Sequence, residues 1–143
     1  MREYKFYGWE TADITDDRGL TPRDYYDLLS GIWCAETCAT RMRPDWTPEN
    51  RTLGQCSITS FLMQERFGGR VFGIPNGDGT FHCFNVVGDC VFDLTSEQFG
   101  DKNLDYADCV EQFGEIHLAR EEKRARYAFL REQLLARLDA MKN

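Results

Sequence analysis

The chain has 143 residues, a length typical of one domain with its own hydrophobic core. Its formal net charge of −7 argues against a nucleic-acid partner, which needs a basic face. No apolar run approaches the roughly 18 residues of a membrane span, and the N-terminus lacks the apolar segment of a signal peptide. With six cysteines in a chain of ordinary size, we expect a single soluble domain over residues 1–143 in a reducing, cytoplasmic setting.

Residues 1–20 mix aromatic and acidic side chains without a sustained period, which predicts an irregular lead-in packed on the body. Thr21 as N-cap, Pro22 at the first helical position and the acidic Asp24 predict a helix start. We expect this helix to continue to about Met42. Its apolar positions are Tyr25, Leu28, Leu29, Ile32 and Trp33.

A second helix is predicted over residues 55–67, after a loop at 45–53, and Gly68-Gly69 supplies its C-terminal stop. Strands are predicted after it, at 70–74, 80–87 and 90–95.

The last two strands form a predicted hairpin whose two-residue loop, at 88–89, begins with the glycine that suits a type II′ turn. Pairing Val87 with Cys90 makes His82 and Asp93 diagonal neighbours on one face of the sheet. At that separation a carboxylate can reach an imidazole N–H. The register therefore predicts a contact between His82 and Asp93.

The same register separates the other polar groups of the hairpin. Cys83 is set against Leu94 and away from Cys90, so we expect no disulfide within the hairpin. Asn85 lies on the face opposite to His82, which argues against Asn85 as the residue that orients the imidazole. We expect the Asn85 side chain to hydrogen-bond a neighbouring loop instead.

Beyond the hairpin, residues 96–100 are predicted to form a helical turn and residues 101–108 an acidic loop. A long helix is predicted over residues 116–141 and is interpreted as a structural brace, packed on the sheet or on a partner. One apolar stripe runs along this helix and consists of Tyr127, Leu130, Leu134, Leu138 and Met141.

Cys56 stands in the first turn of the second predicted helix, where free N–H groups and the helix macrodipole lower the pKa of a thiol. His82 would accept its proton, and Asp93 would orient the imidazole and stabilise its charge. The alternatives are structural: Cys56 as a small buried apolar residue, His82 as a core histidine, and Asp93 as a cap of the turn at 96–99. The predicted contact between His82 and Asp93 favours the catalytic triad.

Such a triad also needs hydrogen-bond donors for the oxyanion that forms on the substrate. The backbone N–H of Cys56, at the helix start, is one predicted donor. The sequence does not single out a second donor. Gln55, Asn50 and the indole of Trp46 are the candidates.

The residues around the triad resemble two groups of proteins. The chain resembles the transglutaminase-like core of the papain-like superfamily in Gly54-Gln55-Cys56, Gly68-Gly69, Val71, Ile74-Pro75, His82-Cys83-Phe84 and Val91-Phe92-Asp93-Leu94-Thr95. It is more closely similar to the bacterial YunG-like family of uncharacterised proteins, over about residues 44–99 and more loosely the C-terminal helix. The motifs of that resemblance are Gly54-Gln55-Cys56-x-x-Thr59, His82-x-aromatic-Asn85 and Asp93-Leu94-Thr95-x-x-Gln98-Phe99.

The resemblance implies an α+β, papain-like scaffold with its catalytic-type core within residues 21–99. In this scaffold a helix-start cysteine packs on a small antiparallel sheet. It implies acyl chemistry by a cysteine hydrolase or acyltransferase with the triad Cys56, His82 and Asp93, and no cofactor. Two positions depart from the transglutaminase-like pattern, because Phe84 stands where Trp is usual and Leu94 where Pro is usual. A domain that keeps this fold need not keep the activity.

Two other classes of protein therefore stay open. A non-catalytic binding module on the same fold would hold a peptide or a partner segment in the groove near Cys56. A zinc-stabilised structural protein would use Cys34 and Cys38, four apart on one predicted helical face, but no second clean pair follows and no metal site is predicted. The sequence does not determine the oligomeric state. The substrate, a small molecule or a peptide, is also left open, and the acidic composition only suggests that it is cationic or neutral.

Overall fold

The computed structural model describes residues 3–100 and 102–141. The helices are α1 (Pro22–Ser30), α2 (Cys56–Phe67), α3 (Gly114–His117) and α4 (Glu121–Ala140), joined by the 3₁₀ helices η1 (Trp9–Thr11), η2 (Thr40–Asp45), η3 (Pro48–Asn50) and η4 (Ser96–Phe99). The strands are β1 (Arg70–Pro75), β2 (Phe81–Val87), β3 (Cys90–Phe92) and β4 (Val110–Gln112). The fold is α+β, as predicted.

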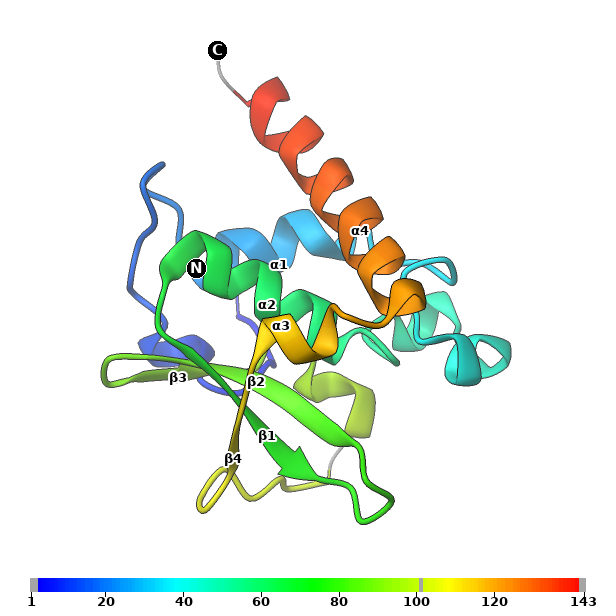
Figure 1. The fold of residues 1–143 in the computed structure, drawn as a ribbon. Helices are drawn as coiled ribbons and strands as arrows, with labels where there is room; N and C mark the ends of the chain where they lie inside the picture. The colour runs from blue at the N-terminus through cyan, green and yellow to red at the C-terminus, as the bar shows by residue number, and fades with distance from the viewer. Residues whose placement is uncertain (1–2, 101, 142–143) are drawn as a thin grey trace.

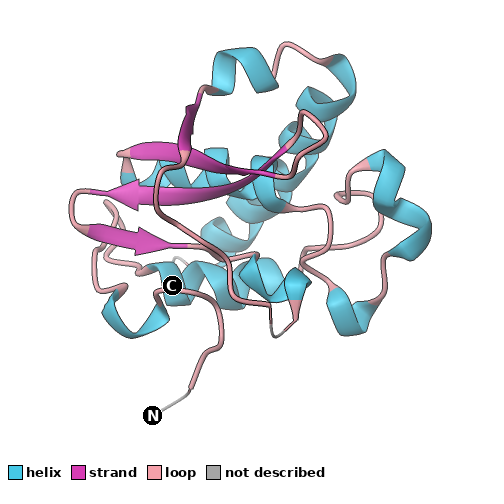
Figure 2. Cartoon of the chain, turned by 90° about the horizontal axis from the view of Figure 1, so that it is seen from below, coloured by secondary structure: helices cyan, strands magenta, loops and turns pink. Residues whose placement is uncertain are grey.

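The four strands form one antiparallel sheet in the order β3-β2-β1-β4. The helices α1, α2 and α4 lie on one side of this sheet (Figure 1), and Figure 2 shows the strands side by side with helices behind them. Helix α2 packs directly on β2 and β1, and α4 packs on α2 and α1. The core between these layers includes Phe6, Tyr25, Leu29, Ile58, Leu62, Met63, Phe92, Leu130, Leu134 and Leu138.

The β2–β3 hairpin has the predicted register, with Val87 opposite Cys90. Its ladder ends at Phe92, short of the predicted end of the strand. Asp93 pairs instead with Tyr7, whose carbonyl accepts the Asp93 N–H at 3.0 Å. The lead-in thus takes over the hydrogen bonding at this point, and the expected pairs of Leu94 and Thr95 with β2 do not form.

Strand β4 was not predicted. It has three residues and pairs with the edge of β1, where Gln112 lies opposite Val71. So short a segment contains too few alternations of apolar and polar side chains to be recognised as a strand.

The first helix is shorter than predicted, since α1 ends at Ser30 and not near Met42. Its start has the predicted form, with a complete capping box at the N-terminus. Gly31 closes the helix by donating its N–H back to two carbonyls of the last turn, and the Ser30 carbonyl accepts from the guanidinium of Arg51. These contacts satisfy carbonyl groups of the last turn of α1, and the residues that follow form turns instead of continuing the helix.

The predicted helix over residues 116–141 is two helices. Helix α3 ends at His117, and α4 begins at Glu121. The carbonyl of Leu118, between them, accepts the Arg124 guanidinium at 3.1 Å instead of continuing the helix. The apolar stripe is buried on α4 at Leu130, Leu134 and Leu138, whereas Met141 follows the helix and is 51% exposed.

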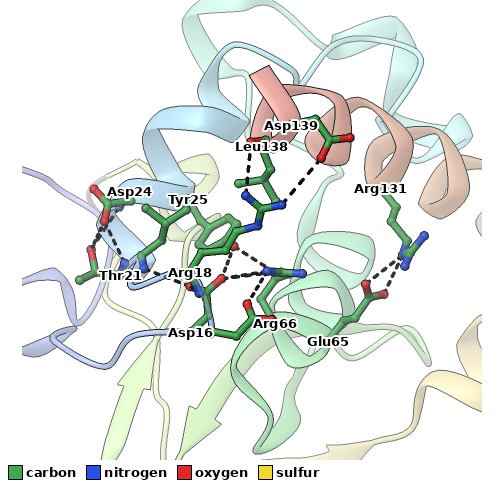
Figure 3. Close-up of polar contacts among 12 residues, drawn as sticks. Asp16, Arg18, Thr21, Asp24, Tyr25, Glu65, Arg66, Arg131, Leu138 and Asp139 are labelled. Atoms are coloured by element: carbon green, nitrogen blue, oxygen red, sulfur yellow. Dashed lines mark hydrogen bonds and ion pairs between the residues drawn. The ribbon is translucent and has the colours of Figure 1, made fainter. Parts of the chain in front are cut away.

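The lead-in is tied to α2 by a buried ion pair (Figure 3). The Asp16 carboxylate is fully buried, and Nη2 of Arg66 lies 3.2 Å from its Oδ2. Burial would raise the pKa of Asp16, but a hydrogen bond from Tyr25, two backbone N–H groups and Arg66 hold that pKa below its usual value. The carboxylate therefore stays ionised in the folded chain and depends on its partners.

Replacing Arg66 with Met is expected to destabilise the fold by about 3 kcal/mol, because the buried Asp16 carboxylate loses its cation. The free energy of unfolding in urea at neutral pH measures this effect. The matched control is Arg131→Met, which breaks a more exposed pair with Glu65 and is expected to cost less than about 1 kcal/mol. Equal losses for the two variants would contradict a buried, charged Asp16.

Candidate active site

The turn at Gly54 places the cysteine at the start of α2. Gly54 has φ +72°, and a Cβ at this position would lie 2.5 Å from Cys38 Sγ and 2.9 Å from the backbone N of Ala39. Only glycine combines this backbone conformation with so close an approach. Gln55, the predicted first residue of the helix, is its N-cap residue. Cys56 is the first residue of α2 and thus lies in its first turn, as predicted.

His82 and Asp93 form a buried hydrogen bond at the place that the register predicted. Nε2 of His82 lies 2.6 Å from Oδ2 of Asp93, and the two side chains are 2% and 1% exposed. The second oxygen, Oδ1, accepts the N–H of Thr95 at 3.2 Å. Thr95 is the N-cap residue of η4, so the carboxylate contacts both the imidazole and the start of this turn.

Tyr106 holds the same carboxylate from another side. Its hydroxyl donates to Asp93 Oδ2 at 2.8 Å, and its ring stacks on Tyr7 with centroids 3.8 Å apart. Burial and then the charge of Asp93 raise the pKa of Tyr106, so that the hydroxyl remains a donor. Tyr106 could not be recognised from the sequence, because it lies in a segment recognisable only as an acidic loop.

The thiol of Cys56 lines a cavity and is stabilised as an anion by its neighbours. In its protonated form the thiol donates to the Phe81 carbonyl, whose oxygen lies 3.8 Å from Sγ. The hydrogen bond with Cys83 lowers the pKa of Cys56 most; burial opposes this effect and the interaction with His82 adds to it. The pKa of Cys83 is raised, because its S–H donates to Cys56 and is itself buried. Cys56, at the helix start, is therefore the thiolate of the pair.

His82 carries the matching positive charge. Burial would lower the pKa of His82, but the charge and hydrogen bond of Asp93, followed by Cys56, raise it to about 10. Because Nε2 is committed to Asp93, Nδ1 is the ring nitrogen left for the thiol. The ring of Phe99 covers the imidazole edge-on, with centroids 4.7 Å apart. At neutral pH these shifts favour a thiolate beside an imidazolium.

A cavity of about 950 Å³ opens above the thiol, with Cys56 and His82 in its wall. Its other walls come from the start of η2, the turn between β1 and β2, helix η4, and the segment from β4 to α4. The polar residues of these walls include Thr40, Arg41, Asn76, Asp78, Thr80, Gln98, Gln112, His117, Arg120, Glu122, Lys123 and Arg126. A cavity of this size suits a small molecule or a peptide segment.

The three side chains predicted as oxyanion donors are not among the described residues that line this cavity. Gln55 is fully buried, and its Nε2 donates to the Cys34 carbonyl at 3.1 Å. The indole N–H of Trp46 donates to the Arg51 carbonyl at 3.0 Å, and Asn50 lies in η3. A donor role for any of the three stays a prediction.

Gln98 is a cavity-lining amide that was not among the donors predicted from the sequence. Its Oε1 accepts the N–H of Gly54 at 3.4 Å, and its Nε2 donates to the Thr95 carbonyl at 3.1 Å. The same Nε2 lies 3.5 Å from Nδ1 of His82. Gln98 therefore joins the turn before Cys56 to the segment after Asp93. Its one sequence signal is its place in the YunG-like motif.

Cys34 and Cys38 do not share a helical face, since α1 has already ended and both lie in a turn. Cys38 is buried beneath Gly54, and Cys34 is partly exposed. Within residues 3–100 and 102–141, no three histidine, cysteine or acidic side chains are grouped as a metal ion would require. The cysteines of the chain are free thiols throughout this described part.

The family model described as YunG protein matches residues 21–139. The chain belongs to this family. A relative from Bacillus subtilis (strain 168), named "Uncharacterized protein YunG", is 41% identical over 54 residues, which are 38% of this chain and 46% of the relative. No solved structure matches the chain significantly. The transglutaminase-like resemblance stays a hypothesis.

In this member of the YunG family, the matched region contains every residue of the predicted triad. None of the described helices is both long enough and apolar enough to span a membrane.

Removing the Cys83 S–H is expected to raise the pKa of Cys56, so that Cys83→Ala slows alkylation of Cys56 about tenfold at about pH 6. Cys83→Ser retains an O–H donor and is expected to stay close to the parent. The measurement is the rate of reaction with iodoacetamide against pH, assigned to Cys56 by peptide mass spectrometry. Identical pH profiles for the parent and the alanine variant would contradict the thiol pair.

The two histidines are expected to titrate far from the usual pKa of about 6.5. The pKa of His82 is raised to about 10, while burial and then Lys123 lower the pKa of His117 to about 4. Because the folded pKa of His82 exceeds its unfolded value, its charge stabilises the fold fully below about pH 6.5 and loses this effect as pH rises through about 10.

NMR titration of the imidazole protons measures both values, and Asp93→Asn is expected to lower that of His82 alone. Two histidines that titrate together near 6.5 would show that neither environment is as described.

Proposed function

We propose that this chain is a cysteine-dependent acyl-transfer enzyme, an amide or ester hydrolase or an acyltransferase. Cys56 is the nucleophile, His82 the acid–base group and Asp93 the carboxylate that orients it. One observation carries this proposal: the buried 2.6 Å contact between His82 and Asp93 lies beside a helix-start thiol that lines a cavity. A cysteine with a purely structural role needs neither the cavity nor the charged imidazole.

In the first half-reaction the Cys56 thiolate attacks the carbonyl carbon of the substrate and forms a C–S bond. His82, as imidazolium, gives its proton to the leaving amine or alcohol as the bond to the carbonyl carbon breaks. A thioester and a neutral imidazole remain. Asp93 keeps the ring in place throughout and does not need to accept a proton.

In the second half-reaction the neutral His82 takes a proton from water or from an acceptor amine. The oxygen or nitrogen of that molecule attacks the thioester carbon, the C–S bond breaks, and the thiolate and the imidazolium are restored. Water as acceptor gives hydrolysis, and an amine gives transfer.

The oxyanion of each step is assigned to two donors. The backbone N–H of Cys56 lies at the positive end of α2. We assign the second donor to the side-chain amide of Gln98, which lines the cavity next to the imidazole. Once Nδ1 of His82 is protonated, the Gln98 N–H can no longer donate to it and is left for the substrate.

We infer a papain-like, transglutaminase-like arrangement for the same reasons. Helix α2 begins with Cys56 and packs on β2, which carries His82, while Asp93 follows the neighbouring strand β3. Phe84, at the position of the usual tryptophan, is buried against the ring of Tyr106. A nucleophilic thiolate and unpaired cysteines suit a reducing compartment such as the cytoplasm, where we place the protein.

The test is reaction of the intact chain with p-nitrophenyl acetate, read by intact and peptide mass spectrometry. We expect one acetyl group on Cys56 and release of p-nitrophenol, both abolished in Cys56→Ala. His82→Gln is expected to slow acylation at neutral pH by about a hundredfold or more. Cys109→Ala, which removes another partly exposed cysteine, is the matched control and is expected to behave as the parent.

Acetylation spread evenly over several cysteines, or equal rates in the parent and in His82→Gln, would overturn the proposal. A non-catalytic binding module on the same scaffold would then be the better account of the cavity.

A further inference from the structure

The cavity beside Cys56 has the opposite charge balance to the chain as a whole. The chain carries a formal net charge of −7. The ionised side chains around the cavity, apart from those of the triad, are two acidic ones, Asp78 and Glu122, and four basic ones: Arg41, Arg120, Lys123 and Arg126. A basic cavity in an acidic protein needs an explanation from its individual charges.

Two of the basic side chains have acidic partners. Nε of Arg126 lies 2.7 Å from Glu122 Oε2, and its Nη1 donates to a backbone carbonyl at 3.1 Å. Arg41 lies 4.0 Å from Asp78, and both are well exposed. These pairs account for both carboxylates, which leaves the charges of Lys123 and Arg120.

Among the described residues, the hydrogen-bond partner of the Lys123 ammonium is neutral. Its Nζ lies 3.0 Å from Nδ1 of His117, whose Nε2 lies 2.8 Å from Oε1 of Gln112. The amide nitrogen of Gln112 is committed to the carbonyls of Val110 and Glu111, so its oxygen faces His117 as an acceptor. His117 therefore carries its proton on Nε2 and accepts from Lys123 through Nδ1.

Burial and the nearby ammonium hold the pKa of His117 down to about 4, so the imidazole is uncharged at neutral pH. Within residues 3–100 and 102–141, no carboxylate lies within ion-pair distance of Lys123. The half-buried ammonium uses one of its three N–H groups on His117. Two further donors and a full positive charge are left in the wall of the cavity.

We propose that Lys123, assisted by Arg120, forms a binding site for an anionic group of the substrate, which we call the anion seat. The anionic group is a carboxylate or a phosphate carried by the acyl group that Cys56 attacks. The placing of the anion on an acyl group depends on the proposed function. The anion seat itself depends only on the charges that line the cavity. Lys123 and Cys56 line the same cavity, so a substrate held there can contact both. The substrate is thus an amide or ester whose acyl group carries a negative charge.

The test compares alkylation of Cys56 by iodoacetate, an anion, with alkylation by the neutral iodoacetamide on the full chain at one pH and low salt. Both reagents react with the same thiolate. The ratio of the two rates therefore does not depend on the thiolate fraction or on the nucleophilicity of Cys56. We expect the ratio of the iodoacetate rate to the iodoacetamide rate to be higher for Cys56 than for 2-mercaptoethanol, a small neutral thiol. Raising the salt concentration is expected to lower that ratio.

Lys123→Gln is expected to lower the ratio about fivefold, and Lys123→Arg to retain it. Lys102→Gln, which removes the same charge outside this cavity, is the matched control and is expected to leave the ratio unchanged. If Lys123→Gln fails to fold by circular dichroism, Arg120→Gln at the exposed edge takes its place with a smaller expected decrease.

A ratio that is independent of salt and unchanged on loss of Lys123 or Arg120 overturns the anion seat. This outcome is separable from failure of the proposed function, which would appear in the iodoacetamide rate alone as a Cys56 no faster than the other cysteines.

Discussion

The Asp93 carboxylate is the group on which the rest of the site depends. A carboxylate that is 1% exposed is costly unless hydrogen bonds and an opposite charge compensate it. Thr95 and Tyr106 donate to its oxygens, and His82 contacts it at 2.6 Å. The compensating charge is best supplied by protonated His82. That charge in turn favours the thiolate of Cys56, so burial of one acid biases the protonation of two other groups.

This arrangement is assembled from segments far apart in the chain. Tyr7, in the lead-in, fixes the backbone of Asp93 through the bridge that replaces the end of the β3 ladder. The same tyrosine stacks on Tyr106, which reaches Asp93 from the loop before β4. The lead-in is itself fastened to α2 by Asp16 and Arg66. The stability of the outer segments and the geometry of the imidazole are therefore coupled.

The local elements were predictable where a short stretch of sequence contains the whole physical cause. The glycine turn and Cys56 at a helix start are of this kind, as is the hairpin whose two-residue loop fixes its register. The end of α1 was not, because it depends on Arg51 reaching back to the Ser30 carbonyl. Tyr106 was missed for the same reason, since its function as a donor exists only after the chain has folded.

Cys83 shows a different limit. Its sequence position, next to His82, places it on the other face of β2, which suggests that it has no part in the site. In the fold that face is the one covered by α2, and the start of α2 brings the Cys56 thiol against it. Alternation along a strand predicts which residues share a face. It does not predict which group of a neighbouring helix meets that face.

The net charge of the chain does not predict the charge of the cavity lining, because acidic and basic side chains are distributed unevenly over the molecule. The negative charge is carried by segments such as the lead-in and the acidic loop, whereas the α3–α4 junction presents Arg120 and Lys123 beside the thiol. At physiological ionic strength, charges more than about 8 Å apart across solvent are largely screened. A charged group that enters the cavity is therefore expected to respond to the nearby ammonium more than to the net charge. The acidic composition suggests a cationic or neutral substrate, whereas the proposed anion seat at Lys123 predicts an anionic one, because a nearby charge acts more strongly than distant charges screened by solvent.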